Sequence, residues 1–246
     1  MERIDKILSS QGLCSRREAA ALVRAGAVTV DGAPVRSPAD KADPASQVIA
    51  VHGRPLCYQA HVYILLHKPQ GVLSASADRR ERTVLDLLDE SLRRRGGLFP
   101  AGRLDRDTEG LLLVTDDGPF AHRMLSPASH VEKTYYLRTD RDIPPHAVEA
   151  MRAGVTIEGG YHTRPARLTL LAPREARLTI TEGKYHQVKL MLRTVGCTVT
   201  YLRRERIGGV CLPPDLAPGE YRLLSPAEAA GFLQKNAESD DASAQL

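Results

Sequence analysis

The chain has 246 residues, of which 42% are hydrophobic and 26% are charged, and its formal net charge is +4. This composition is typical of a globular protein, and the length accommodates one large domain or a large and a small one. A membrane-spanning helix is not expected, because no apolar stretch approaches the roughly 18 residues that a span needs. The four cysteines are scattered without metal-ligand spacing, and the N-terminus is charged from Glu2 onward. We therefore expect a cytoplasmic protein with reduced thiols and no secretory signal.

The positive charge is unevenly distributed along the chain. Three acidic residues and no basic one follow Lys235, so the remainder of the chain is more basic than its average suggests. Basic residues are densest between positions 184 and 206. This distribution favours a polyanionic partner such as RNA, although many basic surfaces are merely solvated.

Residues 1–58 are predicted to form a separate small module. Apolar residues at positions 4, 7 and 8 share one face of a helix that Gly12 ends. Ser15 and Glu18 have the spacing of a capping box that begins a second helix. Short strands are expected at 28–30, 34–35 and 48–51, with tight turns between them.

Residues 1–51 resemble the S4 RNA-binding domain. The resemblance runs through RIDK at 3–6, SR at 15–16 and GAVTVDG at 26–32. It implies a basic helical face that contacts RNA phosphates, which positions the RNA but reads little of its sequence. The residues expected to make these contacts are Arg3, Lys6, Arg16 and Arg17. An amphipathic helical hairpin with solvated arginines remains the alternative.

After a linker at 55–60, strands and helices alternate with unequal spacing. This pattern predicts a mixed, mainly antiparallel α/β domain over residues 59–235, and an α+β fold for the whole chain. Strands are expected at 62–66, 111–115, 133–139, 164–171 and 176–181, and helices at 83–88, 144–152, 185–195 and after Ser225. The acidic tail at 236–246 is expected to be disordered.

The segment 102–110, GRLDRDTEG, places three carboxylates between apolar flanks. Such flanks usually form buried strands, and an unpaired carboxylate at the edge of a core is costly unless it has a use. A salt-bridged, solvated turn is one alternative. A calcium loop is another, because Asp105, Asp107, Glu109, Gly110 and Asp116 fall at EF-hand positions, although Glu109 and Asp116 are not the usual residues there.

Two further segments complete an ordered set of motifs. KTY at 133–135 lies on a predicted strand, and GKYHQVK at 183–189 lies at the start of a predicted helix. Together with GRLD and DTEG at 102–110, they resemble the three core motifs of the RNA pseudouridine synthases. With the S4-like head, the set resembles the RsuA branch, which modifies 16S ribosomal RNA of the small subunit. HKPQG at 67–71, TDDG at 115–118 and RERIGG at 204–209 also fit that branch.

The resemblance implies roles for three residues. Asp105 matches the catalytic aspartate, which would either attack C1′ of the target uridine or draw a proton from its sugar. Tyr135 matches the active-site tyrosine that stacks on a flipped-out base, although its position on an amphipathic strand also fits a core tyrosine. Lys189 matches the basic partner that keeps the carboxylate charged in a desolvated pocket, although a solvated helix lysine is the alternative.

The same comparison supplies expected RNA contacts in the catalytic domain. Arg103 is placed to meet the phosphate of the flipped nucleotide or the vacated base stack. Lys133, Lys184, Arg204 and Arg206 are the other expected contacts. No catalytic role is assigned to His186, which is expected to cap a helix or make a structural hydrogen bond. His67 and Leu190 depart from residues that are common in the family.

The resemblance implies an enzyme that needs no cofactor or metal and acts as a monomer on ribosomal RNA, without membrane association. Two alternatives stay open. The sister branches that modify 23S ribosomal RNA share all three core motifs. An RNA-binding ribosome assembly factor with an inert enzyme domain is the other.

Overall fold

The computed structural model describes residues 1–234, so the predicted acidic tail at 236–246 lies outside the described residues. The chain divides into two compact units. The first contains Met1–Val62 together with Leu85–Phe99, and the second contains Tyr63–Val84 and the chain from Pro100 onward. The boundary predicted between residues 58 and 59 stays a prediction.

The first unit begins with two helices and a small sheet. Helix α2 (Arg16–Arg24) begins at Ser15, whose hydroxyl accepts a hydrogen bond from the Glu18 amide while the Glu18 carboxylate accepts one from the Ser15 amide, so the predicted capping box is confirmed. Apolar faces of both helices meet in a core that contains Ile4, Leu8 and Val23. The elements are β1 (Glu2–Arg3), α1 (Ile4–Ser10), α2, β2 (Val28–Val30), β3 (Ala33–Pro34), β4 (Lys41–Ala42), β5 (Ile49–Val51) and β6 (Arg54–Pro55), with sheet order β3-β2-β5-β6 and β1 paired with β4.

A segment from much later in the sequence completes this unit. The predicted helix at 83–88 is a single 3₁₀ turn, η1 (Val84–Leu87), and α3 (Glu90–Arg94) follows it. The buried Arg95 guanidinium donates hydrogen bonds to the Gln11 side chain and to the Gln59 carbonyl. Gly12 has φ +70° and a Cβ there would lie 2.3 Å from the Ser91 carbonyl oxygen, so only glycine permits this close approach.

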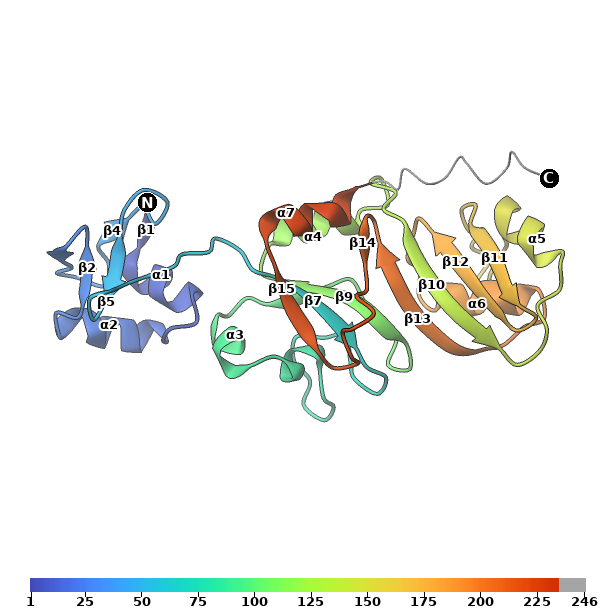
Figure 1. Ribbon diagram of the computed structural model, residues 1–246, viewed down its shortest axis with the longest axis horizontal. Coiled ribbons are helices and arrows are strands. Elements are labelled where there is room, and N and C mark those ends of the chain that lie inside the picture. The colour runs from blue at the N-terminus through green and yellow to red at the C-terminus, as the bar shows by residue number, and fades with distance from the viewer. Residues whose placement is uncertain (235–246) are drawn as a thin grey trace. The chain divides into compact units, whose positions relative to one another are not determined.

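The second unit is built on one nine-stranded sheet (Figure 1). Its order is β11-β12-β10-β13-β9-β7-β15, with β14 paired to β13 and β8 paired to β9. Strands β9 and β13 run parallel, and the other pairs with a described register along this order are antiparallel, which confirms the mixed, mainly antiparallel prediction. The strands are β7 (Tyr63–Lys68), β8 (Phe99–Ala101), β9 (Glu109–Thr115), β10 (Lys133–Thr139), β11 (Arg167–Ala172), β12 (Glu175–Ile180), β13 (Val199–Ile207), β14 (Val210–Cys211) and β15 (Tyr221–Leu224).

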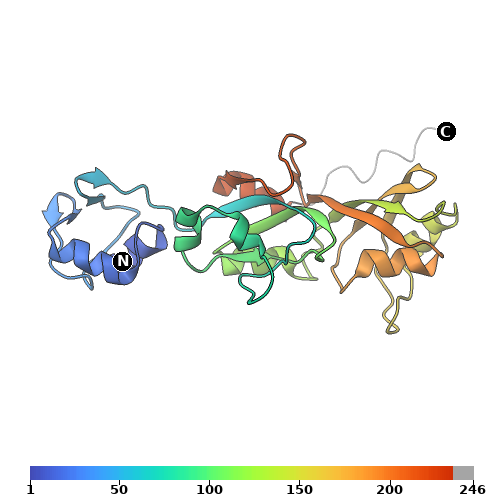
Figure 2. The ribbon, with the colours of Figure 1, turned by 90° about the horizontal axis from the view of Figure 1, so that it is seen from below.

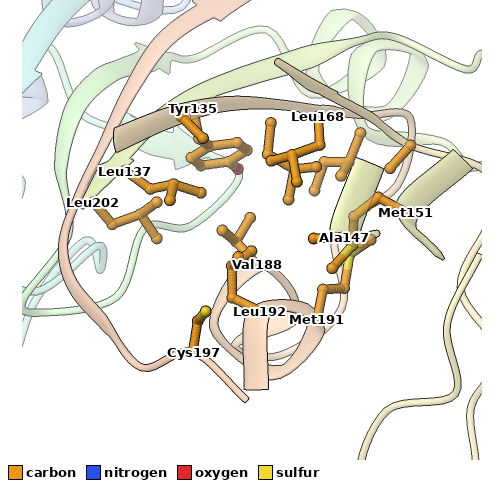
Figure 3. Close-up of a cluster of buried hydrophobic side chains, with 14 of the residues drawn as sticks. Tyr135, Leu137, Ala147, Met151, Leu168, Val188, Met191, Leu192, Cys197 and Leu202 are labelled. Carbon is orange, nitrogen blue, oxygen red and sulfur yellow. The ribbon is translucent and has the colours of Figure 1, made fainter. Parts of the chain in front are cut away.

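Helices of the second unit pack apolar residues against the sheet. Helix α6 (Gln187–Thr194) lies along one face of the part of the sheet that contains β10 and β12, as the view from below shows (Figure 2). Its Met191 and Leu192 join Met151 of α5 in a fully buried cluster (Figure 3). The helical elements are α4 (Gly118–Leu125), α5 (Ala147–Ala153), α6 (Gln187–Thr194), α7 (Pro226–Ala230) and the 3₁₀ turn η2 (Gly231–Leu233). Among residues 1–234, no helix is long and apolar enough to cross a membrane.

Candidate active site

A buried lysine fixes the loop that carries Asp105. Lys68 at the end of β7 is 0% exposed, and its ammonium donates hydrogen bonds to the carbonyls of Asp105 (3.0 Å) and Thr108 (2.8 Å). Burial lowers the pKa of Lys68 to about 8, despite the opposing charge of Asp105. A buried ammonium is tolerated here because its protons are hydrogen-bonded to backbone carbonyl groups.

Two more anchors hold the same loop. The Ser74 hydroxyl exchanges hydrogen bonds with both backbone groups of Leu104, at 2.8 Å and 3.0 Å. The Gly71 amide donates to the Arg106 carbonyl at 2.7 Å. Residues on both sides of Asp105 are therefore hydrogen-bonded to the segment 68–74, so the position of the Asp105 backbone is set before any ligand binds.

Asp105 faces a lysine from α6. The Lys189 ammonium lies 3.0 Å from Oδ2 of Asp105 and 2.6 Å from Oδ1 of Asp107. Burial alone would lower the pKa of Lys189, but its hydrogen bonds to Asp107 and Asp105 outweigh burial and raise it. Likewise the pKa of Asp107 is lowered, because Lys189 outweighs its partial burial. An ammonium whose pKa is raised thus accompanies Asp105, whose side chain is 26% exposed.

His186 approaches the other oxygen of Asp105. Its Nε2 lies 3.6 Å from Oδ1, and the residue occupies the N-cap position of α6 in the left-handed region, with φ 50° and ψ 25°. Among the described residues, its side chain makes no capping hydrogen bond to α6. Of the two roles expected for His186, a helix cap or a structural hydrogen bond, the side-chain cap is therefore not formed, and the ring lies near Asp105 instead.

Tyr135 lies in the apolar cluster that joins the three motif segments. It is 7% exposed and packs in the same cluster as Leu104, which precedes Asp105, and Val188, which precedes Lys189 (Figure 3). The three segments that the sequence analysis singled out therefore meet around one core. A hydrophobic cluster of this kind fixes the backbones that carry Asp105 and Lys189.

Arg204 lies against Tyr135 and is almost fully buried. Its Nε donates to the Leu111 carbonyl at 2.8 Å, and its Nη1 lies 3.4 Å from the Tyr135 hydroxyl. Gly110 makes this possible, because a Cβ there would lie 2.3 Å from the Arg204 carbonyl oxygen where β9 and β13 pair. With 3% exposure, Arg204 presents almost no surface to a ligand in this structure, and the RNA contact predicted for it stays a prediction.

Lys133 is a second predicted RNA contact that the structure buries. It is 8% exposed and donates to the Val131 carbonyl at 2.9 Å. Burial, and then the charge of Arg204, lower its pKa to about 8. The strand pattern placed Lys133 on one face of β10 but could not indicate that this face is covered. Its ammonium serves the local backbone and is not available to a phosphate.

The other predicted RNA contacts remain accessible. Arg103, Arg16, Arg17 and Lys184 are exposed, and Arg206 is half-buried. Arg3 and Lys6 are also exposed but are paired with acidic neighbours, Arg3 with Asp5 at 2.7 Å and Lys6 with Glu2 at 3.3 Å. A phosphate would have to compete with those carboxylates.

The calcium alternative does not fit this geometry. Glu109 to Thr115 form a straight strand, β9, so Asp105 and Asp116 lie beyond opposite ends of it rather than around one loop. The carboxylates of Asp105 and Asp107 are paired with Lys189. Among residues 1–234, no group of three or more potential ligands could hold a metal ion.

Comparison with known proteins agrees with the motifs. Residues 62–194 match the RNA pseudouridylate synthase family, and residues 2–48 match the S4 domain. An uncharacterized RNA pseudouridine synthase of Bacillus subtilis is 48% identical over 230 residues, covering 92% of this chain and 96% of that protein. The chain belongs to the RNA pseudouridylate synthase family. It is thus an RNA pseudouridine synthase with an N-terminal S4 domain.

Two further relatives cover nearly the whole synthase. Ribosomal small subunit pseudouridine synthase A of Escherichia coli is 45% identical over 233 residues, covering 94% of this chain and all of that protein. A crystal structure of a pseudouridylate synthase is 35% identical with a TM-score of 0.67, and it covers 94% of this synthase and all of the other chain. The similarity therefore extends over both compact units.

Sequence reasoning missed one residue of this site. Lys68 was noted only as part of HKPQG and received no role, although it fixes the loop that carries Asp105. The available signal was a lysine two residues after the apolar run at 62–66, with Pro69 and Gly71 behind it. That pattern predicts a strand end, but only the tertiary structure shows which carbonyls the ammonium meets.

Proposed function

We propose that this synthase isomerises one uridine of small-subunit (16S) ribosomal RNA to pseudouridine. The proposal is supported by the 45% identity to an enzyme named for the ribosomal small subunit, over the full length of that enzyme. The observation that carries the chemistry is the Asp105 carboxylate 3.0 Å from the Lys189 ammonium, on a loop fixed by buried hydrogen bonds. A ribosomal RNA substrate also favours action in the cytoplasm. We further propose that the synthase acts as a monomer.

The target uridine must leave the base stack before its glycosidic bond can be reached, which costs a few kcal/mol. In the proposed mechanism Tyr135, which is 7% exposed, contacts the extruded uracil with the part of its ring that the apolar cluster leaves uncovered. Asp105 acts at the ribose, by attack on C1′ or by removal of a sugar proton, while the N1–C1′ bond breaks. The uracil then turns over and C5 bonds to C1′, which displaces the carboxylate in the first route and is accompanied by return of the sugar proton in the second. The proton on C5 is lost to water, and N1 takes up a proton.

Lys189 has an electrostatic role in this scheme. When the nucleotide enters, water leaves the site and the cost of keeping Asp105 charged increases. The adjacent ammonium offsets that cost, and Asp107 holds it in place from the other side. Arg103, exposed beside Asp105, is proposed to contact the phosphate of the flipped nucleotide or the stack it leaves.

The proposal is tested by tritium release. Small-subunit and large-subunit ribosomal RNA transcripts, labelled with tritium at C5 of uracil, are incubated with the purified chain. Because C5 becomes bonded to C1′, the reaction must release this tritium to water. We expect release from the small-subunit RNA alone. Release only from large-subunit RNA would assign the chain to a sister branch. No tritium release from either RNA or from a partly assembled small subunit would support the assembly-factor alternative.

A further inference from the structure

An exposed aromatic residue, Tyr185, lies next to the candidate site. Tyr185 is 80% exposed, although it is flanked on both sides by residues of the site. One face of its ring is covered, because it stacks on His186 with ring centroids 3.8 Å apart and an angle of 20° between the planes. With so much of the side chain exposed, the opposite face of the ring is open to solvent.

His186, which lies near Asp105, positions the Tyr185 ring that stacks on it. His186 contributes its Nε2 at 3.6 Å from Asp105 Oδ1 and its ring plane to Tyr185. It does so from a left-handed backbone conformation, which is unfavourable for a residue with a side chain and is found where the surrounding structure imposes it. Within the pair, His186 thus lies near the Asp105 carboxylate, and Tyr185 presents an open aromatic face.

Buried hydrogen bonds hold the loop in this conformation. Gln187 is 3% exposed, and its amide group donates to Glu182 at 2.6 Å while its oxygen accepts from the Lys184 amide at 2.9 Å. Glu182, itself 7% exposed, also accepts hydrogen bonds from the Tyr161 hydroxyl and the Arg164 amide. A rigid loop that displays a tyrosine has little entropy to lose when a ligand stacks on it.

The chemistry of this surface fits an unpaired nucleobase. Aromatic side chains bind single-stranded RNA by stacking on bases, and cations beside them contact the backbone. Lys184 is exposed next to Tyr185 and supplies such a cation. Extruding the target uridine leaves its neighbours without a stacking partner, and such a base lies close to the nucleotide at Asp105.

We infer that the Tyr185–His186 stack is a platform for a base that flanks the target uridine in the substrate RNA. This inference rests on the proposed function and adds a second stacking residue, distinct from Tyr135. Tyr185 does not touch the reacting atoms in this scheme, so it contributes to substrate binding and to the choice of sequence context rather than to the chemical step.

The test combines protein and RNA variants in a double-mutant cycle. Tyr185→Ala, Tyr185→Leu and Tyr185→Phe are compared with wild type on a short RNA that contains the mapped target uridine, and on versions with an abasic site at each flanking nucleotide. Tyr185→Ala and Tyr185→Leu are expected to lower kcat/KM by roughly 5- to 150-fold, mainly through KM, while Tyr185→Phe retains wild-type values. At one flanking position the abasic RNA should abolish the difference between wild type and Tyr185→Ala.

Controls separate this inference from the function itself. Leu171→Ala removes a 44% exposed side chain from β11 of the same unit and is expected to have no effect. An equal Tyr185→Ala effect on every abasic RNA, or none on any, would overturn the inference while wild-type tritium release upholds the proposed function. An effect seen only on ribosomal particles and not on free RNA would assign the surface to a protein partner and would also overturn it. If the wild-type enzyme released no tritium, the proposed function itself would be refuted, independently of the Tyr185 variants.

Discussion

Basic residues are used in opposite ways at the N-terminal helices of the first unit and at the ends of β7 and β10 in the second unit. In the first unit, Arg16 and Arg17 are exposed at the start of α2, and Arg3 is paired with a neighbour two residues away. In the second, Lys68 and Lys133 are buried and donate to backbone carbonyls. A surface cation is available to phosphates and contributes little to folding, whereas a buried one is costly and persists only where its hydrogen bonds are satisfied. Basic composition alone therefore overstates the RNA-binding surface.

Lys68→Met tests the buried cations of this comparison. The variant removes the donor to the Thr108 carbonyl and one of two donors to the Asp105 carbonyl, so the loop that carries Asp105 should shift. We expect kcat to fall about 100-fold, as displacements near 1 Å can cause, and the free energy of unfolding to fall by about 3 kcal/mol. Chemical denaturation and steady-state tritium release measure the two. Lys41→Met, at an exposed lysine of the first unit, is the matched control and should change neither. Wild-type kcat in Lys68→Met would show that the loop does not depend on this lysine.

Arg16→Glu combined with Arg17→Glu tests whether the exposed arginines of the first unit contact RNA phosphates. If both arginines contact phosphates, the slope of log affinity against log salt should fall by about one unit for each, and KM should rise with kcat unchanged. Filter binding over a salt series measures the slope. Lys133→Met, which removes a buried cation, should leave the slope unchanged. Equal salt slopes in the double variant and wild type would contradict the role of this unit in RNA binding.

Lys133 also predicts a pH dependence of stability. Its pKa is about 8 in the folded chain against an ordinary value of 10.5, so between these values the unfolded state binds more protons than the folded state. Stability therefore rises with pH in this window, by up to about 1.4 kcal/mol per pH unit for one lysine, and the cost of burial is fully present below pH 8. Lys133→Met should flatten this rise between about pH 8 and pH 9.5 in urea unfolding. An unchanged slope would mean that Lys133 is not a buried cation in the folded state.

Much of the fold could be predicted because its signals are local. The Ser15 capping box requires only residues three apart, and apolar alternation identified strand β10 within its observed bounds. The candidate site depended on residues that are distant in sequence. Strand periodicity assigns Lys133 to a face of β10, but whether that face is covered depends on how the neighbouring elements pack. Helix α6 was expected from residue 185, yet it begins at Gln187, because His186 adopts a left-handed conformation that sequence periodicity does not reveal.

The most direct test of the account compares Asp105→Asn with Asp107→Asn. Both variants remove one carboxylate that pairs with Lys189, so they change the local charge equally. The measurement is single-turnover tritium release from small-subunit ribosomal RNA, with RNA affinity measured in parallel. We expect Asp105→Asn to lose at least about 10⁴-fold in rate at unchanged affinity, as loss of a nucleophile or base does, while Asp107→Asn still turns over. Equal rates in the two variants would contradict a catalytic role for Asp105.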